Sequence, residues 1–113
     1  MPVDREVIPL KAKLFRGLAD PSRLAILETL RDGARTVSEV VARTGLSQPN
    51  ASMHLDCLWC CGLVDREARG RYTYYWIASK KVVRILAAAQ EVLDQVADRL
   101  EQCRRYEERP RPR

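Results

Sequence analysis

The sequence predicts a mainly α-helical fold that carries one β-hairpin. Four segments before residue 61 place apolar residues at helical spacing, and residues that favour helix ends bound them. From residue 64 to 77 the spacing changes to the alternation of a strand pair, and a long helix with a narrow apolar stripe follows. A chain of 113 residues with 46% hydrophobic content is sufficient for one such domain, predicted over residues 1–108.

The first helix is predicted over residues 9–18, where leucines recur at helical spacing at Leu10, Leu14 and Leu18. In the second helix, Asp20 caps the start, Pro21 takes the first helical position and Gly33 ends the helix. The residues predicted to face inward are Leu24, Leu27 and Leu30.

Two short helices separated by a glycine predict a helix-turn-helix motif. The segment Thr36–Glu39 has the pattern of a capping box, and Gly45 ends the helix that it starts. The predicted buried residues of this helix are Val37, Val40 and Val41. Ser47 caps the next helix, and its inner stripe is predicted to consist of Ala51, Leu55 and Leu58.

An aromatic hairpin is predicted after these two helices. Tyr72, Tyr74 and Trp76 alternate with the residues between them, and the segment Arg69–Arg71 supplies a glycine turn. A hairpin in this position is the wing of a winged helix-turn-helix fold, and its basic tip is suited to contact DNA phosphates.

The last helix is predicted to run from about Ser79 to about Glu108. Its apolar residues are spaced alternately by four and three, at Val82, Leu86, Ala89, Leu93, Val96, Leu100 and Cys103. A seam this narrow is typical of a helix that packs along another helix, so with Leu10 and Leu14 it predicts the interface of a homodimer. The alternating Arg and Pro of residues 109–113 predict a disordered basic tail.

Composition restricts the class of protein only modestly. The formal net charge of +5 favours an anionic partner, but the last ten residues hold five arginines against two glutamates and supply most of that charge. No segment reaches the roughly 18 apolar residues of a membrane span, and Met1–Arg5 lacks the apolar stretch of a signal peptide. The protein is therefore expected to be cytoplasmic, where four cysteines favour thiols or metal ligands over disulfides.

Three cysteines lie in the run Asp56–Gly62, at the end of the predicted recognition helix. Cys57 and Cys61 are one helical turn apart on one flank, so their thiolates can share an ion. Cys60 falls opposite the buried stripe and is poorly placed as a third ligand, although a frayed helix end before Gly62 would move it. A third sulfur must then come from Cys103, either in the same subunit or in its partner.

A site built of thiolates favours soft ions, namely Cd(II), Pb(II), Hg(II), As(III), Sb(III) or Cu(I). Zn(II) prefers four ligands, and His54 on the same flank is the nearest candidate for the fourth. The last helix offers Asp94, Asp98 and Glu101 but no histidine, which argues against a zinc or nickel site on that helix.

The order of the helices and three segments resemble the ArsR/SmtB family of dimeric winged-helix repressors; these segments are Leu18–Leu24, Leu46–Leu55 and Gly62–Val64. The resemblance covers roughly residues 10 to 105. Within the family, the cysteine spacing resembles that of the CmtR-type cadmium and lead sensors. This resemblance implies Cys57, Cys61 and Cys103 as ligands, with Cd(II) or Pb(II) as the first choice of ion and As(III) or Sb(III) next.

The resemblance implies a repressor that binds double-stranded operator DNA as a homodimer, with no membrane and no small-molecule substrate as partner. The residues of the recognition helix predicted to contact DNA are Gln48, Asn50, Ser52, Met53 and His54. The wing is predicted to contact phosphate through Arg66, Arg69 and Arg71. Metal capture would hold the thiols in a geometry that opposes DNA binding, so that a resistance or efflux gene is derepressed.

Two alternatives use the same cysteines. A redox-sensing repressor of the same fold would oxidise Cys57, Cys60 or Cys61, which requires a thiolate stabilised by positive charge. A thiol enzyme would need a base, and His54 is the only candidate. Because the sequence shows no set of nucleophile, base and orienting group, the protein is predicted not to be an enzyme.

Overall fold

The computed structural model describes residues 3–103. In chain order the elements are α1 (Val7–Ala19), α2 (Pro21–Thr29), β1 (Arg35–Thr36), α3 (Val37–Thr44), α4 (Gln48–Cys60), β2 (Val64–Arg69), β3 (Tyr72–Ile77) and α5 (Lys80–Gln102). The predicted winged helix-turn-helix fold is confirmed, with α3 and α4 as the helix-turn-helix and β2 and β3 as the wing. No helix among the described residues is both long enough and apolar enough to span a bilayer.

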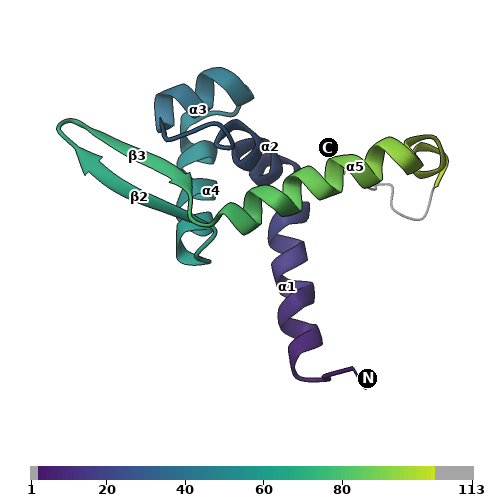
Figure 1. Ribbon diagram of the computed structural model, residues 1–113. Helices are drawn as coiled ribbons and strands as arrows, with labels where there is room; N and C mark the ends of the chain where they lie inside the picture. The colour runs from purple at the N-terminus through teal and green to yellow at the C-terminus, as the bar shows by residue number, and fades with distance from the viewer. Residues whose placement is uncertain (1–2, 104–113) are drawn as a thin grey trace, which may run out of the picture.

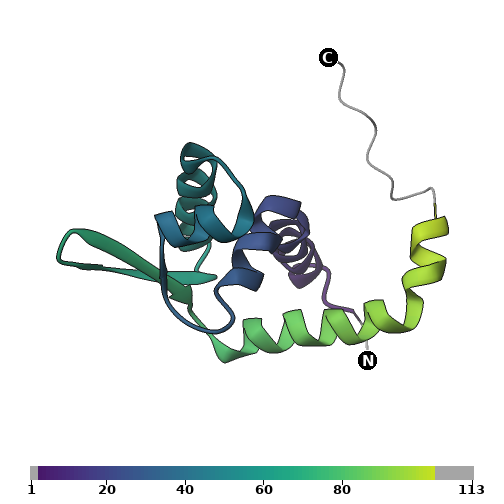
Figure 2. The same ribbon diagram turned by 90° about the horizontal axis from the view of Figure 1, so that it is seen from above.

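Three helices, α2 to α4, form one body, and the wing, α1 and α5 extend from it in different directions (Figures 1 and 2). The largest fully buried side chains are Ile26, Leu27, Leu30, Val40, Leu55 and Leu58 in this body and Val64 at the start of the wing. In contrast, α1 buries only Leu18, and α5 buries only Val82 and Leu86. Most of the surface of both terminal helices therefore lies outside the protomer's core.

The wing belongs to a three-stranded antiparallel sheet with the order β1-β3-β2. In β1, which the sequence pattern does not indicate, Arg35 pairs with Tyr75 and Thr36 pairs with Tyr74. Gly70 opens the two-residue turn between β2 and β3 at a φ of 63°, a left-handed conformation that glycine adopts without a steric penalty. The predicted hairpin is thus confirmed and is anchored at its base by one further strand.

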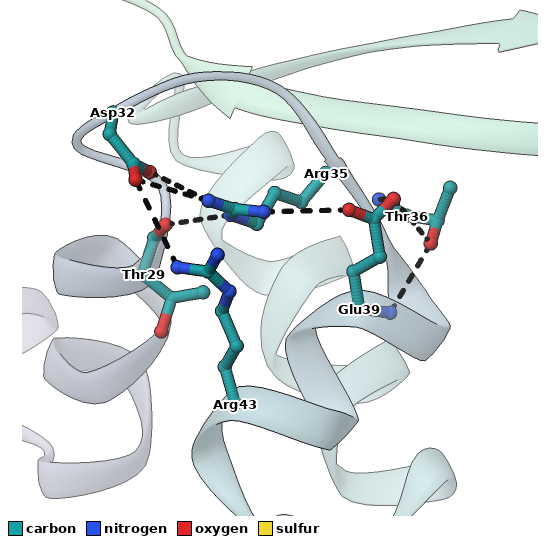
Figure 3. Close-up of polar contacts among 6 residues, drawn as sticks. All are labelled: Thr29, Asp32, Arg35, Thr36, Glu39 and Arg43. Atoms are coloured by element: carbon teal, nitrogen blue, oxygen red, sulfur yellow. Dashed lines mark hydrogen bonds and ion pairs between the residues drawn. The ribbon is translucent and has the colours of Figure 1, made fainter.

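Arg35 ties β1 to the helices on either side of it (Figure 3). Its guanidinium donates to both Asp32 carboxylate oxygens at 3.0 and 3.1 Å, to the Thr29 carbonyl at 3.2 Å and to Glu39 at 3.4 Å. Arg43 lies 3.9 Å from the same Asp32 carboxylate. These contacts fix the end of α2 and the start of α3 relative to the base of the wing.

The same arginine explains why α2 ends four residues before the predicted boundary at Gly33. In a continuing helix the Thr29 carbonyl would accept a hydrogen bond from the Gly33 N–H, but here it accepts from Arg35 Nε. The Gly33 N–H donates instead to the Leu30 carbonyl at 3.3 Å, which closes a turn.

Most residues predicted for the core are buried, and the exceptions lie at the edges of the helical stripes. The confirmed residues are Leu18, Leu27, Leu30, Val40, Ala51, Leu55 and Leu58. The prediction that Leu24 faces inward is wrong: Leu24 is 38% exposed, and Ile26 lies on the inner face of α2 in its place. Val37 and Val41 pack against the core but are only half-buried, because they flank Val40 on the helix.

The terminal helices also differ from their predicted bounds. α1 begins at Val7, two residues early, because Pro9 lies in the first turn, where no intrahelical N–H bond is lost. α5 follows the predicted cap Ser79 but ends just before Cys103, which is the C-terminal cap and not a residue inside the helix. The predicted continuation of this helix and the predicted tail fall on residues 104–113, outside the described residues.

The Thr36→Ala variant is expected to destabilise the domain by about 1 kcal/mol, the usual cost of losing a helix N-cap. Thr36 Oγ1 accepts from the Glu39 N–H at 3.2 Å, and the Glu39 carboxylate accepts from the Thr36 N–H at 3.3 Å. Urea unfolding followed by circular dichroism measures the loss, with the exposed Ser38→Ala as the control. An unchanged free energy of unfolding in Thr36→Ala contradicts this role.

The same capping box makes stability depend on pH. Hydrogen bonds from the Thr36 N–H and hydroxyl lower the pKa of Glu39 below its ordinary value of 4.5. The stabilisation is therefore present above pH 4.5 and is lost as the pH falls through the lowered folded-state pKa. Glu39→Gln is expected to flatten this acid dependence in unfolding experiments between about pH 3 and 7. An equally steep loss of stability in the variant would argue against it.

Candidate nucleic-acid interface and thiol cluster

The first half of α4 keeps its polar side chains outside the core. Ser47 caps the helix by accepting from the Asn50 N–H at 3.3 Å, and Ala51 and Leu55 turn fully inward. The residues predicted to contact DNA all keep accessible surface: Gln48, Asn50, Ser52, Met53 and His54. This face of α4 is therefore available to enter a groove of DNA.

Gln48 at the start of α4 and Arg71 at the tip of the wing line one shallow hollow of about 290 Å³. The other lining residues come from β1, the start of α3 and β3: Thr36, Val37, Ser38, Tyr72, Thr73 and Tyr75. The predicted base-contacting helix and the predicted phosphate-contacting turn thus share one surface, as simultaneous contact with a groove and its backbone requires.

Arg66 has a different environment from the one that the sequence predicts. It donates to Asp56 at 2.8 Å, and its guanidinium lies 3.7 Å from the centroid of the Trp59 ring. The pKa of Arg66 is raised, first by the side chain of Tyr75 and then by the Asp56 carboxylate. In the protomer the Arg66 cation is thus engaged with α4, and its predicted phosphate contact stays a prediction. Sequence patterns do not indicate this contact, because Asp56 and Trp59 precede Arg66 by ten and seven residues and lie in a different element.

Arg69 and Arg71 are the more accessible cations of the wing. Arg69 pairs with Glu67 at 3.2 Å, and both side chains are more than half exposed, so solvent screens this pair and it contributes little. Arg71 is exposed at the turn. These two side chains are thus the better placed for the predicted phosphate contacts.

The predicted thiol pair lies at the end of α4. Cys57, Cys60 and Cys61 are exposed and line a hollow of about 510 Å³ between α1 and α4. The Cys61 N–H donates to the Cys57 carbonyl at 3.0 Å, so these two residues stand one helical turn apart, as predicted. Cys60 differs from expectation in one respect, because it borders the same hollow although it was placed opposite the buried stripe.

Positive charge surrounds these thiols. Lys13 and Arg16 from α1 and Arg23 from α2 line the same hollow. Arg23 is fixed there by donating to the Gly17 carbonyl at 2.8 Å. The hollow therefore combines three exposed thiols with three basic side chains.

Cys103 does not reach this hollow. It is half-buried at the end of α5, and both views place that end far from α4 (Figures 1 and 2). Within residues 3–103 of one protomer, no three His, Cys, Asp or Glu side chains gather closely enough to hold an ion. A three-sulfur site made by one subunit alone is therefore not formed in this structure.

Comparison with known proteins identifies the family. Residues 20–66 match the family model described as bacterial regulatory protein, arsR family. A probable mercury resistance operon repressor of Streptomyces lividans is 37% identical over 94 residues, which are 83% of this chain and 75% of that protein. The chain belongs to the arsR family. The HTH-type transcriptional regulator CmtR of Mycobacterium tuberculosis is 40% identical over 82 residues, which are 73% of this chain and 70% of that protein.

Solved structures agree with this arsR-family membership. The solution structure of the homodimeric winged helix-turn-helix DNA-binding domain Mb0332 from Mycobacterium bovis is 30% identical, with a TM-score of 0.71. The match covers 100% of this chain and 98% of that one. The family and the fold together confirm that the chain is a DNA-binding transcriptional regulator and not an enzyme.

In this arsR-family chain, His54 lies near the start of α2. Its charge helps to lower the pKa of Asp20, although the largest cause is the Arg23 backbone N–H, which donates to Asp20 at 3.0 Å. His54 is not among the residues that line the cysteine hollow. The structure therefore does not place it as the fourth ligand that Zn(II) would need.

Proposed function

We propose that the protein is a metal-responsive repressor that binds operator DNA as a homodimer and leaves it when a soft metal ion binds its cysteines. The observation that carries this proposal is the position of Cys57 and Cys61. Both thiols are exposed at one end of α4, and the other end bears the predicted base-contacting residues. An ion held there can favour one position of the DNA-reading helix over another, which is the requirement for shifting the binding equilibrium.

The third sulfur in this proposal is the partner's Cys103. The thiol pair and Cys103 are far apart within one protomer, and α5 extends from the body with its apolar residues after Leu86 exposed or half-buried. α5 has 23 residues and runs away from the body before it bends near its end, which places that end where a neighbouring subunit can approach it (Figure 2). Pairing of the terminal helices of two subunits would cover their exposed apolar residues and bring the end of α5 to the partner's α4.

Cd(II) and Pb(II) are the ions that we propose first, since three thiolates suit soft ions of low coordination number. The relative named for mercury resistance adds weight to Hg(II), which shares this preference for sulfur. As(III) and Sb(III) follow, with Cu(I) as a further soft ion. Zn(II) comes last because it prefers four ligands, and the proposed site supplies three thiolates.

A thiol-redox repressor is the second candidate, and the exposure of the thiols favours it. Cys57, Cys60 and Cys61 are exposed beside one hollow, where an oxidant from solvent can reach them. In that case peroxide in metal-free buffer releases the DNA, and a reductant restores binding. A metal sensor instead responds to Cd(II) under reducing conditions and recovers with a chelator.

One titration tests both candidates. A fluorescent operator duplex, selected by the protein from a random library, reports DNA binding by anisotropy while sulfur-to-metal absorption reports metal binding. The metal proposal expects both signals to change together when Cd(II), Pb(II), Hg(II) or As(III) is added. It is wrong if none of these ions releases the duplex, or if protein with chemically blocked thiols releases it equally well.

A further inference from the structure

Arg66 of the wing contacts the part of α4 that carries the thiols. Its guanidinium donates to Asp56 at 2.8 Å and lies 3.7 Å from the centroid of the Trp59 ring. Asp56 and Trp59 are three residues apart and therefore share one face of the helix. They directly precede Cys57 and Cys60 in the sequence.

This contact is well suited to hold two elements in a fixed orientation. The planar guanidinium stacks on the indole and at the same time donates along its edge to the carboxylate, which restricts both position and angle. The Arg66 side chain is 33% exposed, against 61% for Asp56, so the cation is the more enclosed partner. Among residues 3–103, this is the side-chain hydrogen bond that joins α4 to the β2–β3 hairpin.

The arginine contact and the thiol pair lie on different flanks of α4. At about 100° per residue, Asp56 and Trp59 fall on one side of the buried stripe, and Cys57 and Cys61 fall on the other. The helix is thus bordered by the cysteine hollow beside α1 on one flank and by the wing on the other. A shift or rotation of this end of the helix is therefore transmitted to the wing as long as Arg66 keeps its contacts with Asp56 and Trp59.

We infer that Arg66 is a positioning residue that fixes the wing to the thiol-bearing end of α4, so that the recognition helix and the wing move on DNA as one unit. The part of the inference that concerns metal rests on the proposed function. An ion that displaces this end of α4 would also move Arg69 and Arg71 of the wing away from the DNA backbone. Arg66 then acts through its hold on α4 and not by contacting phosphate.

A metal-free experiment tests the positioning role by asking whether removal of Asp56 weakens or strengthens DNA binding. Removing a carboxylate near DNA strengthens binding if only the overall electrostatic field matters. Asp56→Ala is instead expected to weaken binding to the selected duplex and to lower the slope of log affinity against log salt by about one for each phosphate that the wing no longer reaches. Asp65→Ala, which removes the same charge from β2, is the matched control and should bind as tightly as wild type or more tightly. Tighter binding by Asp56→Ala overturns the inference.

A second arm tests transmission of the metal signal. Arg66→Met should keep the Cd(II) affinity seen in the absorption titration, while the factor by which Cd(II) weakens DNA binding falls by about tenfold. Arg31→Met removes a cation that lies outside the wing, where it pairs with Glu28, and should keep the wild-type factor. An unchanged factor in Arg66→Met overturns the transmission. A wild-type protein that ignores Cd(II) overturns the proposed function, and the metal-free arm still decides whether Arg66 holds the wing.

Discussion

The Cys57→Ser variant is expected to stay on its operator at Cd(II) concentrations that release the wild type. Serine keeps the size of the side chain but removes the thiolate. Residues that only hydrogen-bond to a metal ligand contribute roughly 10–100-fold to metal affinity. Loss of a ligand itself should therefore lower the Cd(II) affinity by more than about 100-fold. Cys57 is exposed, so the domain should fold as before and bind DNA normally without metal. Operator anisotropy and sulfur-to-metal absorption, measured together, check both statements.

Cys60→Ser is the matched control, because this thiol borders the same hollow but is not a proposed ligand. It should keep both signals, and equal loss in the two variants would make Cys60 a ligand of the ion as well. Mixed dimers locate the third sulfur. A subunit carrying Cys57→Ser combined with one carrying Cys103→Ser forms one complete site if the ligands come from both subunits, and none if they come from one. An intact Cd(II) response in Cys57→Ser alone would remove this residue from the site.

Local patterns predict the parts of the fold that local forces decide. The stripe of Ala51, Leu55 and Leu58 is fully buried, and the cap at Ser47 forms its hydrogen bond, because both follow from spacing within one helix. β1 is different: two residues make a strand only because Tyr74 and Tyr75 of a distant segment pair with them. A sequence window that contains only the Arg35–Thr36 segment holds no signal for it.

The candidate site shows the same division between local and distant effects. The separation of Cys57 and Cys61 by one turn follows from helical geometry and is confirmed. The cations that line the same hollow come from α1 and α2, and only the tertiary arrangement of these helices brings Lys13 and Arg23 to it. The phosphate contact predicted for Arg66 stays a prediction, and the structure adds two contacts that charge and sequence position do not indicate, with the Asp56 carboxylate and the Trp59 indole.

The apolar seam of α5 was predicted as one interface, but the structure divides it between two surroundings. Val82 and Leu86 pack into the protomer's own core, whereas Ala89 and Leu93 are exposed. The first apolar residues of the α5 seam thus pack within the protomer, and the later ones are available to contact a partner. Spacing alone gives no means of placing this division, since both surroundings select the same residue types.

The second large effect is expected from Leu10→Glu and Leu93→Glu, which should convert the protein to a monomer with weak operator binding. Both leucines are exposed in the protomer, at 67% and 41%, so a carboxylate there does not disturb the core. Large apolar side chains are also exposed beside them on α1 and α5: Val7, Ile8, Leu14, Phe15, Val92 and Leu100. Such clusters on two protruding helices are typical of a surface that a second protein chain covers.

Disruption of the dimer affects DNA binding because two recognition helices, spaced by about 34 Å, engage successive turns of one duplex. When they are joined, the second helix binds at a high effective concentration, and its removal should weaken operator binding by about 100-fold or more. Sedimentation equilibrium and operator anisotropy measure the two consequences, with Ala42→Glu on the exposed face of α3 as a control for assembly that adds the same charge. Leucine variants that stay dimeric would show that α1 and α5 do not form the interface. Monomers that keep wild-type affinity would show instead that one recognition helix is sufficient.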